Sequence, residues 1–302
     1  IDLKKEESLI YDKRILIPLV LLSIASAIFQ LLILKISEFV FGPFNETFAM
    51  VISLTLLGIA LGSMLCHYIN LNFTFFSITN SLALIFILIF FDKIVLIYAT
   101  YYGDFAESHV TYWKMGILAI LMLWSSISFG SAIPSLLSKE SNVAKESGHL
   151  LFVSSLANSF GYLMMLLVVH PNFKYGETFI LLTVILGLAS IVYSKFDKAV
   201  ITMVIITNII GLVSLNKFWN ENLLYINYKA FSSRSDVLNK MYSYKSGTQY
   251  RKYEDVFSLN KIGNSVYFMV NGYVSMALNM GAEYTVGVVS SPLEGFIEVQ
   301  FR

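Results

Sequence analysis

The chain has 302 residues, of which 56% are hydrophobic, 15% are aromatic and only 14% are charged, and its mean hydropathy is +0.68. This is too little polar surface to cover a water-soluble globule of that length, so the composition excludes an ordinary soluble protein. The formal net charge of +1 gives no reason to expect nucleic acid as a partner. We therefore expect an integral membrane protein that has the lipid bilayer as its main partner.

Residues 1–14 are predicted to form a charged leader, IDLKKEESLIYDKR, because a signal peptide would start basic and end in small residues. The chain does not begin with Met, so we expect it to be a fragment at this end. The single cysteine, Cys66, has no second cysteine with which to form a disulfide. We expect no metal site.

Crossing the hydrocarbon core of a bilayer takes about 20 apolar residues. By this criterion residues 15–215 form a helical transmembrane domain with about seven spans. The predicted spans are Ile15–Phe39, Thr47–Ile69, Phe75–Tyr98, Met115–Leu137, Leu150–His170, Thr178–Tyr193 and Ala199–Leu215.

Basic residues in the short loops predict the orientation. Eight of them lie on the side of the N-terminus and four on the opposite side. Because Lys and Arg are more frequent in cytoplasmic loops, this bias predicts a cytoplasmic N-terminus in a bacterial cytoplasmic (inner) membrane. Seven spans would then place the tail outside, and one span more or fewer would reverse the side of the tail.

Four polar side chains within the predicted spans are candidate functional residues, because a polar group in lipid is costly unless it faces protein or water. They are Gln30, Lys35, Glu38 and Asn158. Lys35 and Glu38 are three residues apart on one helix, so they can form an ion pair. Either these residues line a substrate path, or they form hydrogen bonds between helices and extend to the membrane surface. No span carries a central acid, a proton-relay pair or an arginine ladder, which favours the second interpretation.

Small residues recur at four-residue spacing on three of the predicted spans. Gly58 and Gly62 form a Gly-x-x-x-Gly pair, while Gly130 and Gly161 complete Ser-x-x-x-Gly and Ala-x-x-x-Gly pairs. This spacing lets helix backbones approach closely in lipid, where the expulsion of water drives no association. We expect these four glycines to pack helices. Pro134 is expected to kink or end the fourth span.

Residues 216–302 are predicted to form a water-facing tail with short helices in Phe218–Leu238 and then a small β module. The β-rich runs are Asp255–Leu259, Ser265–Val270, Tyr273–Leu278, Tyr284–Ser290 and Phe296–Phe301. Asn271–Gly272 lies between two of these runs, which is the strongest short signal for a hairpin turn. Because so small a sheet is marginally stable alone, we expect it to rest on the membrane domain, on a partner chain or on a following domain.

Several motifs of this sequence together match those of a known family. They are Gln30, Lys35, Phe41–Gly42, Asn45–Glu46, Leu57–Gly58, Leu61–Ser63, Phe129–Pro134 and Leu156–Gly161 in the membrane half, and Tyr250, Asp255–Leu259 and Phe268–Gly272 in the tail. In these motifs the chain resembles a family of bacterial integral-membrane proteins in which a helical domain precedes a spermidine-synthase-like, or aminopropyltransferase, region. This resemblance implies a role in polyamine metabolism and makes residues 216–302 the start of a synthase-like region.

The tail also departs from that family. Arg251 follows Tyr250, and Ser275 follows the hairpin, at two positions where a synthase would carry Gln. The family's Rossmann-like catalytic domain, with its glycine-rich turn, would begin beyond Arg302. The two glycines in Asn279–Gly287 are too far apart to form such a turn.

We therefore expect this chain to bind no cofactor and to lack a complete catalytic site, so its catalytic residues are unknown. Activity would require a missing catalytic domain or a partner chain. Two other functions stay open. The bundle can be a transporter or channel, or the protein can be a non-enzymatic membrane scaffold whose β tail binds a partner.

Overall fold

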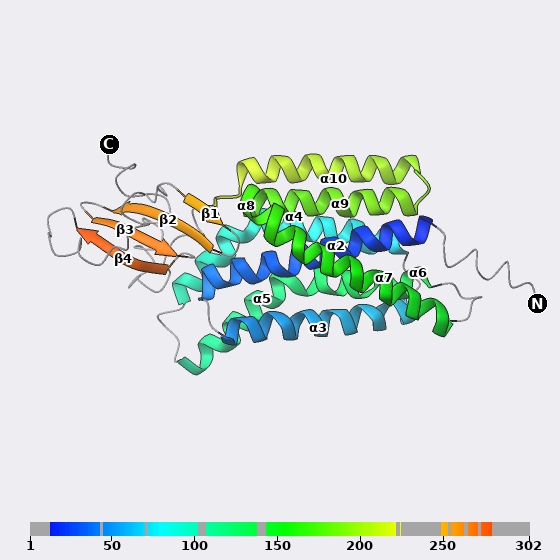
Figure 1. Cartoon of the computed structure of the whole chain (residues 1–302), viewed down its shortest axis with the longest axis horizontal. Helices are drawn as coiled ribbons and strands as arrows, with labels where there is room; N and C mark the ends of the chain where they lie inside the picture. Colours follow the sequence, from blue (N-terminus) through cyan, green and yellow to red (C-terminus); the bar gives the residue numbers. More distant parts are fainter. Residues whose placement is uncertain are drawn as a thin grey trace, which may run out of the picture.

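The computed structural model of the chain describes residues 13–42, 45–69, 72–101, 107–137, 143–221, 224, 249–252, 255–262, 265–270 and 273–279. They form a helical bundle with a small sheet at one end (Figure 1). The helical elements are α2 (Lys13–Phe41), α3 (Asn45–Tyr68), α4 (Phe73–Tyr101), α5 (Glu107–Gly130), α6 (Ala132–Leu136), α7 (Val143–Met164), η1 (Met165–Val169), α8 (His170–Asn172), α9 (Tyr175–Tyr193) and α10 (Lys198–Lys217). The strands are β1 (Gln249–Lys252), β2 (Asp255–Ile262), β3 (Ser265–Val270) and β4 (Tyr273–Asn279).

Seven helical segments among the described residues are long and apolar enough to cross a membrane, which confirms the predicted number. Their starts were predicted less well. α5 begins at Glu107 rather than at Met115, and α7 begins at Val143 rather than at Leu150. The first turns of both helices are polar, so a search for apolar runs misses them. The predicted leader is also too long, because its last two residues belong to α2.

The fourth predicted span is interrupted near its end, as Pro134 suggested. α5 stops at Gly130, Ser131 forms a turn, and α6 continues for one short stretch that contains Pro134. The cause is chemical, because proline has no N–H to donate to the carbonyl four residues earlier, which is that of Gly130. The helix therefore breaks before the proline.

A second irregularity lies near the end of the fifth span. Residues Met165–Val169 form the π-helical turn η1, and the N–H of His170 donates to the carbonyl of Met165, five residues earlier. A π turn inserts one extra residue into a helix and is frequent at functional sites. The side chains after it therefore point in directions that a continuous α-helix would not give them.

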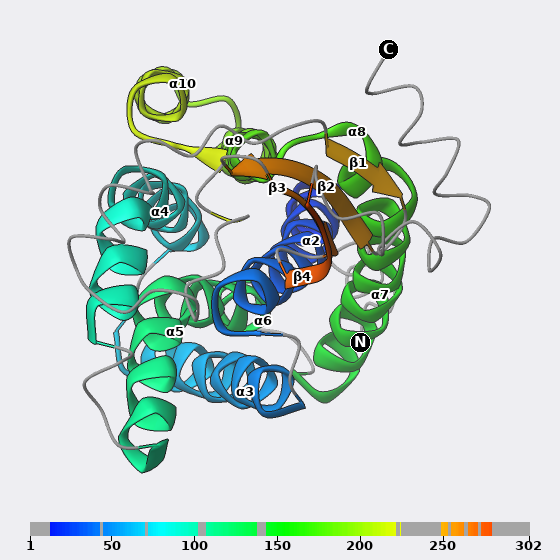
Figure 2. The same ribbon diagram turned by 90° about the vertical axis from the view of Figure 1, so that its left-hand side faces the viewer.

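The helix α2 lies in the middle of the bundle. Seen along the helices, it is surrounded by α3, α5, α7 and α9, while α10 packs outside α9 (Figure 2). Leu19, Ile28, Phe29 and Leu32 of α2 are completely buried. The sequence of α2 is apolar around its whole circumference, which is the pattern of a helix that is buried on all sides.

The four strands form one antiparallel sheet in the order β1-β2-β3-β4. The strands β2, β3 and β4 correspond to three predicted runs, whereas β1 is short and polar and was not predicted. Val270 pairs with Tyr273, so β3 and β4 form the predicted hairpin, although Asn271–Gly272 lie outside the described residues. Most of Phe218–Leu238 and both predicted strands after residue 280 also lie outside them.

The sheet lies at the end of the bundle where α2 ends, opposite the end where α2 begins (Figure 1). Seven consecutive crossings produce this arrangement, because each helix returns the chain to the other end. The start of α2 and the sheet therefore lie at opposite ends of the bundle.

Candidate functional site

The predicted glycines lie at close contacts between helices. A Cβ atom on Gly58 would lie 2.3 Å from the Cβ of Ser126, and one on Gly62 would lie 2.0 Å from the carbonyl oxygen of Ile127. From the other side, a Cβ on Gly130 would lie 2.4 Å from the Cα of Ile59. Real Cβ atoms do not approach so closely, so the α3–α5 contact depends on glycine at all three positions.

Gly161 has the same role between α7 and α2. A Cβ atom there would lie 2.8 Å from the Cβ of Ala27 and 2.9 Å from the carbonyl oxygen of Ile24. On the same pair of helices, the hydroxyls of Ser23 and Ser154 are hydrogen-bonded at 2.9 Å. The α2–α7 contact therefore combines a close backbone approach with polar contacts.

Gln30 lies further along this α2–α7 contact. Its Oε1 accepts a hydrogen bond of 2.5 Å from the hydroxyl of Tyr162, and its Nε2 donates to the hydroxyl of Ser26 at 3.2 Å. Asn158 precedes Tyr162 by one helical turn on α7, and its Oδ1 is buried without a hydrogen-bond partner among the described residues. The structure thus brings Gln30 and Asn158 to one pair of helices.

Lys35 and Glu38 form the ion pair that their spacing predicts, with 3.0 Å between Nζ and Oε2. Both side chains are mostly buried, at 16% and 21% exposed. The two charges neutralise each other within one turn of α2. This local pairing lets both residues lie near the sheet end of a largely apolar helix.

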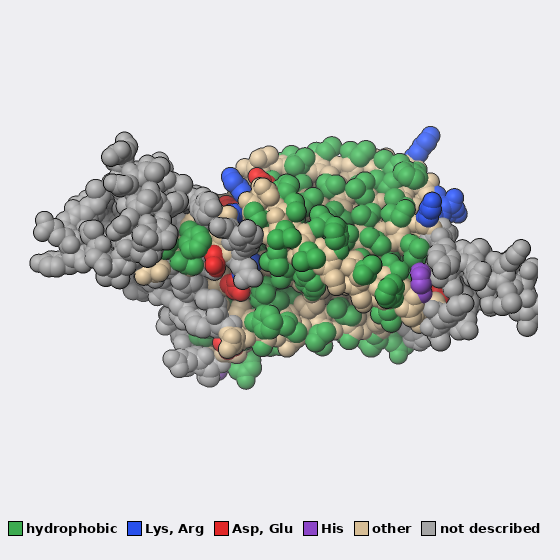
Figure 3. Space-filling model, in the orientation of Figure 1, with side chains coloured by type: hydrophobic (Ala, Val, Ile, Leu, Met, Phe, Trp, Pro, Cys, Tyr) green, Lys and Arg blue, Asp and Glu red, His purple; other side chains and the backbone are tan. Residues whose placement is uncertain are grey.

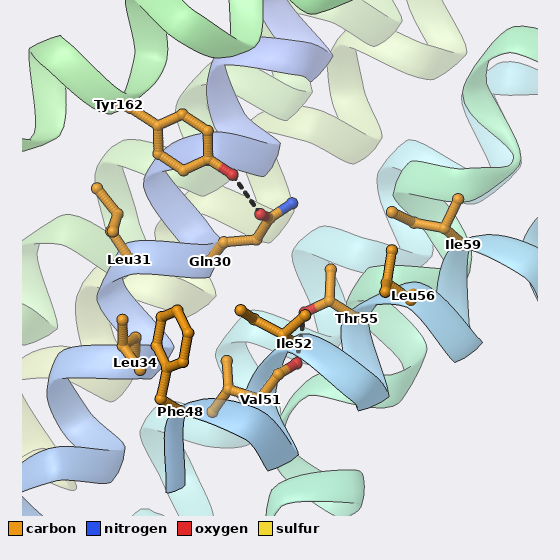
Figure 4. A pocket seen from close by; sticks show the side chains of 10 residues that line it. All are labelled: Gln30, Leu31, Leu34, Phe48, Val51, Ile52, Thr55, Leu56, Ile59 and Tyr162. Atoms are coloured by element: carbon orange, nitrogen blue, oxygen red, sulfur yellow. Dashed lines mark hydrogen bonds between the residues drawn. The ribbon is translucent and has the colours of Figure 1, made fainter. Parts of the chain in front are cut away.

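A cavity of about 380 Å³ lies beside Gln30 (Figure 4). Its walls come from α2, α3 and α7, and most of its lining is apolar. The lining residues are Gln30, Leu31, Leu34, Phe48, Val51, Ile52, Thr55, Leu56, Ile59 and Tyr162. Figure 4 shows the Tyr162 hydroxyl pointing at Gln30 on one side, with the α3 side chains facing them across the cavity.

A second group of polar contacts joins the bundle to the sheet. Glu221 lies at the start of α9, where its Oε1 accepts from the N–H of Tyr175 at 3.0 Å and its Oε2 from that of Gly176 at 3.4 Å. The indole N–H of Trp219 also donates to Oε2, at 2.8 Å. These backbone donors have no partner within the helix, and a carboxylate is favoured at the positive end of the helix dipole.

Arg251, on β1, completes this group. Its guanidinium forms an ion pair with Glu221, donates from Nη1 to the carbonyl of Phe173 at 2.9 Å, and lies 4.7 Å from the ring centre of Tyr175. We call Phe173, Tyr175, Trp219, Glu221 and Arg251 the junction cluster. A planar guanidinium can form an ion pair and stack on a ring at the same time, so Lys would not replace Arg251 here.

His170 is buried beside the junction cluster, with its ring centre 5.8 Å from that of Tyr175. Among the described residues neither of its ring nitrogens has a hydrogen-bond partner. The π turn immediately precedes His170, so this irregularity lies close to the boundary between the bundle and the sheet.

The sequence predicted part of this arrangement. It singled out Gln30 but not its partner Tyr162, and it treated Arg251 only as a departure from a family pattern. The role of Glu221 carries no local signal, because the start of α9 and Arg251 on β1, which it joins, are both far away in the chain. Within the described residues no three His, Cys, Asp or Glu side chains gather as a metal site would require.

The structure therefore offers two places for function, the cavity beside Gln30 and the junction cluster. Comparisons of the chain with protein-family models, with curated proteins and with solved structures found no match.

Proposed function

We propose that the chain is an integral membrane protein of the spermidine-synthase-like kind. Its helical bundle spans a bacterial cytoplasmic membrane and holds a water-facing β module at one end. The single observation that carries this proposal is the junction cluster, because Arg251 joins the first strand of the module to Phe173, directly after α8, and through Glu221 to the start of α9. A role in polyamine metabolism rests on the resemblance of the sequence motifs.

The outer surface of the bundle supports membrane insertion. Hydrophobic side chains cover most of the visible face of the bundle, and Lys and Arg side chains gather near its two ends (Figure 3). Leu56, Phe152 and Leu156 are each more than 60% exposed. In water such a surface would be a strong aggregation site, whereas in lipid it is the expected outer face.

The junction cluster supports the role of the bundle as a platform. A small sheet has little stability alone, and here it is fixed by an ion pair, a hydrogen bond to the backbone and a cation–π contact. These interactions are directional, so they orient the sheet as well as attach it. A catalytic domain or a partner chain that binds the sheet would then be held at a defined position on the membrane surface.

Membrane insertion and topology can be tested together. The protein with Cys66→Ser carries no cysteine, so single cysteines can be introduced by Ser141→Cys or Asn220→Cys and labelled in intact cells with a membrane-impermeant maleimide. We expect the protein to resist extraction by alkaline carbonate and the two cysteines to label from opposite sides. Extraction by carbonate, or labelling of both from one side, would contradict the proposal.

The polyamine role needs its own assay. Membranes that contain the protein are incubated with a nucleoside sulfonium donor of aminopropyl groups and a diamine acceptor, with and without soluble cell extract. The resemblance predicts transfer only when the extract supplies the missing domain or partner. An absence of additional transfer in both arms, relative to membranes without the protein, would count against this role.

A further inference from the structure

The cavity between α2, α3 and α7 has the size and lining of a ligand site. Its volume of about 380 Å³ falls within the range of roughly 300–1,000 Å³ that is usual for small-molecule sites. α3 packs mainly on α5 and α7 packs mainly on α2, which leaves the cavity between α3 and α7. Phe48, Ile52 and Leu56 line it and are also exposed on the outer surface of the bundle, so the cavity opens sideways.

The polar end of the cavity lies deep in the bundle. Gln30 is three residues from the midpoint of α2, and Tyr162 is three residues from the midpoint of the span Glu146–Asn172. At a rise of about 1.5 Å per residue, each lies about 5 Å from the middle of its helix. If the bundle spans a membrane, as proposed above, the polar end therefore lies near the centre of the bilayer.

Gln30 has a donor at this depth that finds no acceptor among the described residues. Its side-chain amide has two N–H groups, and within the described residues only one acceptor, the Ser26 hydroxyl, is in place for them. The amide nitrogen points away from Tyr162, on the side of the cavity (Figure 4). In hydrocarbon an unpaired N–H costs several kcal/mol, so an acceptor brought by a ligand would be favoured.

We infer that this cavity binds a quinone-type lipid, with a carbonyl oxygen of its ring accepting a hydrogen bond from Gln30. The apolar walls suit the ring and the first part of its chain, and the side chains of Phe48 and Tyr162 offer aromatic surface. The site therefore selects an apolar molecule that carries a hydrogen-bond acceptor to the centre of the bilayer.

A phospholipid fits this site less well. Its ester carbonyls lie at the edge of the hydrocarbon core, roughly 15 Å from the centre of a core about 30 Å thick. They would therefore stay about 10 Å away from Gln30. An acyl chain can fill the apolar part of the cavity but brings no acceptor for the amide.

The test uses the whole protein in nanodiscs of a saturated phosphatidylcholine that contain no natural quinone. The probe is a photoreactive benzoquinone with a ten-carbon chain, and labelled peptides are identified by mass spectrometry. We expect labelling in α3 and α7 that is displaced by unlabelled decyl-benzoquinone. Decylbenzene, which has the same chain but no carbonyl, should displace the probe at least about fivefold less well, as expected for one lost hydrogen bond.

Two variants separate the hydrogen bond from the cavity. Gln30→Leu should weaken probe binding about fivefold or more, and Ile52→Trp, which fills the cavity, should weaken it about tenfold or more. Ile205→Trp adds the same bulk at an exposed position of α10 outside the cavity and should leave binding unchanged. If Gln30→Leu does not fold, the Ile52→Trp result and the decylbenzene competition still test the quinone site.

The inference is overturned if decylbenzene competes as well as the quinone, if neither cavity variant weakens binding, or if Ile205→Trp weakens it equally. Carbonate extraction of the cell membranes from which each variant is purified separates this failure from failure of the proposed function. Protein that stays in the membrane but does not bind the probe overturns only the quinone site. Protein that is extracted overturns both.

Discussion

The α3–α5 contact and the junction cluster are held together by different forces. Between α3 and α5, Gly58, Gly62 and Gly130 bring backbone against backbone, and the ion pair of Glu46 with Lys114 lies near the start of α3. At the junction, one arginine and one glutamate connect β1 to the start of α9 and to Phe173, directly after α8. The first contact depends mainly on shape, and the second depends on charge and hydrogen bonding.

The proposed insertion of the bundle into a membrane accounts for this difference. Lipid is as apolar as the helix surfaces, so helices within the bundle gain from close packing rather than from the expulsion of water. At the end of such a bundle the sheet would face water, and a few directional bonds fix its position. Changes of size should therefore damage the bundle, and changes of charge should damage the junction.

The largest effect is expected for Gly62→Leu. The new side chain would collide with the backbone carbonyl of Ile127, which cannot rotate away, so we expect a loss of about 3 kcal/mol in unfolding free energy. SDS-induced unfolding in detergent, followed by circular dichroism, measures this loss. Gly116→Leu is the matched control, because an added Cβ there meets no atom of the described residues within 4 Å. Equal stability of the two variants would refute a packing role for Gly62.

Arg251→Gln should act on the junction alone. The variant removes the ion pair with Glu221 and the cation–π contact, and the partly buried carboxylate loses its charged partner. We expect the free energy that attaches the sheet to the bundle to fall by about 2 kcal/mol, so that limited proteolysis cuts the sheet faster. The unfolding free energy of the bundle should not change. Lys198→Gln, at the exposed far end of the bundle, is the control. Proteolysis of the sheet at the wild-type rate would show that Arg251 does not hold it.

Asn80 tests the comparison between the bundle and the junction cluster, because it is a polar residue inside the bundle. It is completely buried, and neither amide atom has a hydrogen-bond partner among the described residues. Asn80→Leu should therefore raise the unfolding free energy by about 1 kcal/mol. The contrasting variant is Asn208→Leu, which removes hydrogen bonds to Thr183 and Val204 and should lower it. Destabilisation by both would indicate a partner for Asn80 that the described residues do not include.

The smallest effect is expected for Tyr162→Phe. The variant removes the hydrogen bond to Gln30 but keeps the ring, and such bonds between membrane helices average about 0.6 kcal/mol. Unfolding in SDS should detect this loss against Tyr112→Phe, a change on the exposed face of α5. A loss of several kcal/mol would show that the bundle depends on polar contacts as much as the junction does.

The sequence predicted what depends on local pattern. Apolar runs predicted the seven helices, and Gly58 and Gly62 indicated a packing face on α3 because both lie on one helix, although they did not identify α5 as its partner. The hairpin of β3 and β4 was equally visible. The starts of α5 and α7 were misplaced, because polar first turns are helical without being apolar.

The rest could not be predicted because it depends on contacts between distant segments. β1 is a short polar segment that becomes a strand by pairing with β2. Glu221 is recognisable only once the start of α9 lies beside it, and Tyr162 only once α7 packs on α2. The cavity is the space left between packed helices, so no single stretch of sequence encodes it.

The π turn Met165–Val169 has a consequence for how this chain can vary in length. Because the turn holds one residue more than an α-helix would need, a deletion of one residue there can restore regular helix without displacing the neighbours. The same deletion at Gly161 would turn every later side chain of the helix by about 100°. The turn is therefore the position in this span where a change in length disturbs the packing least.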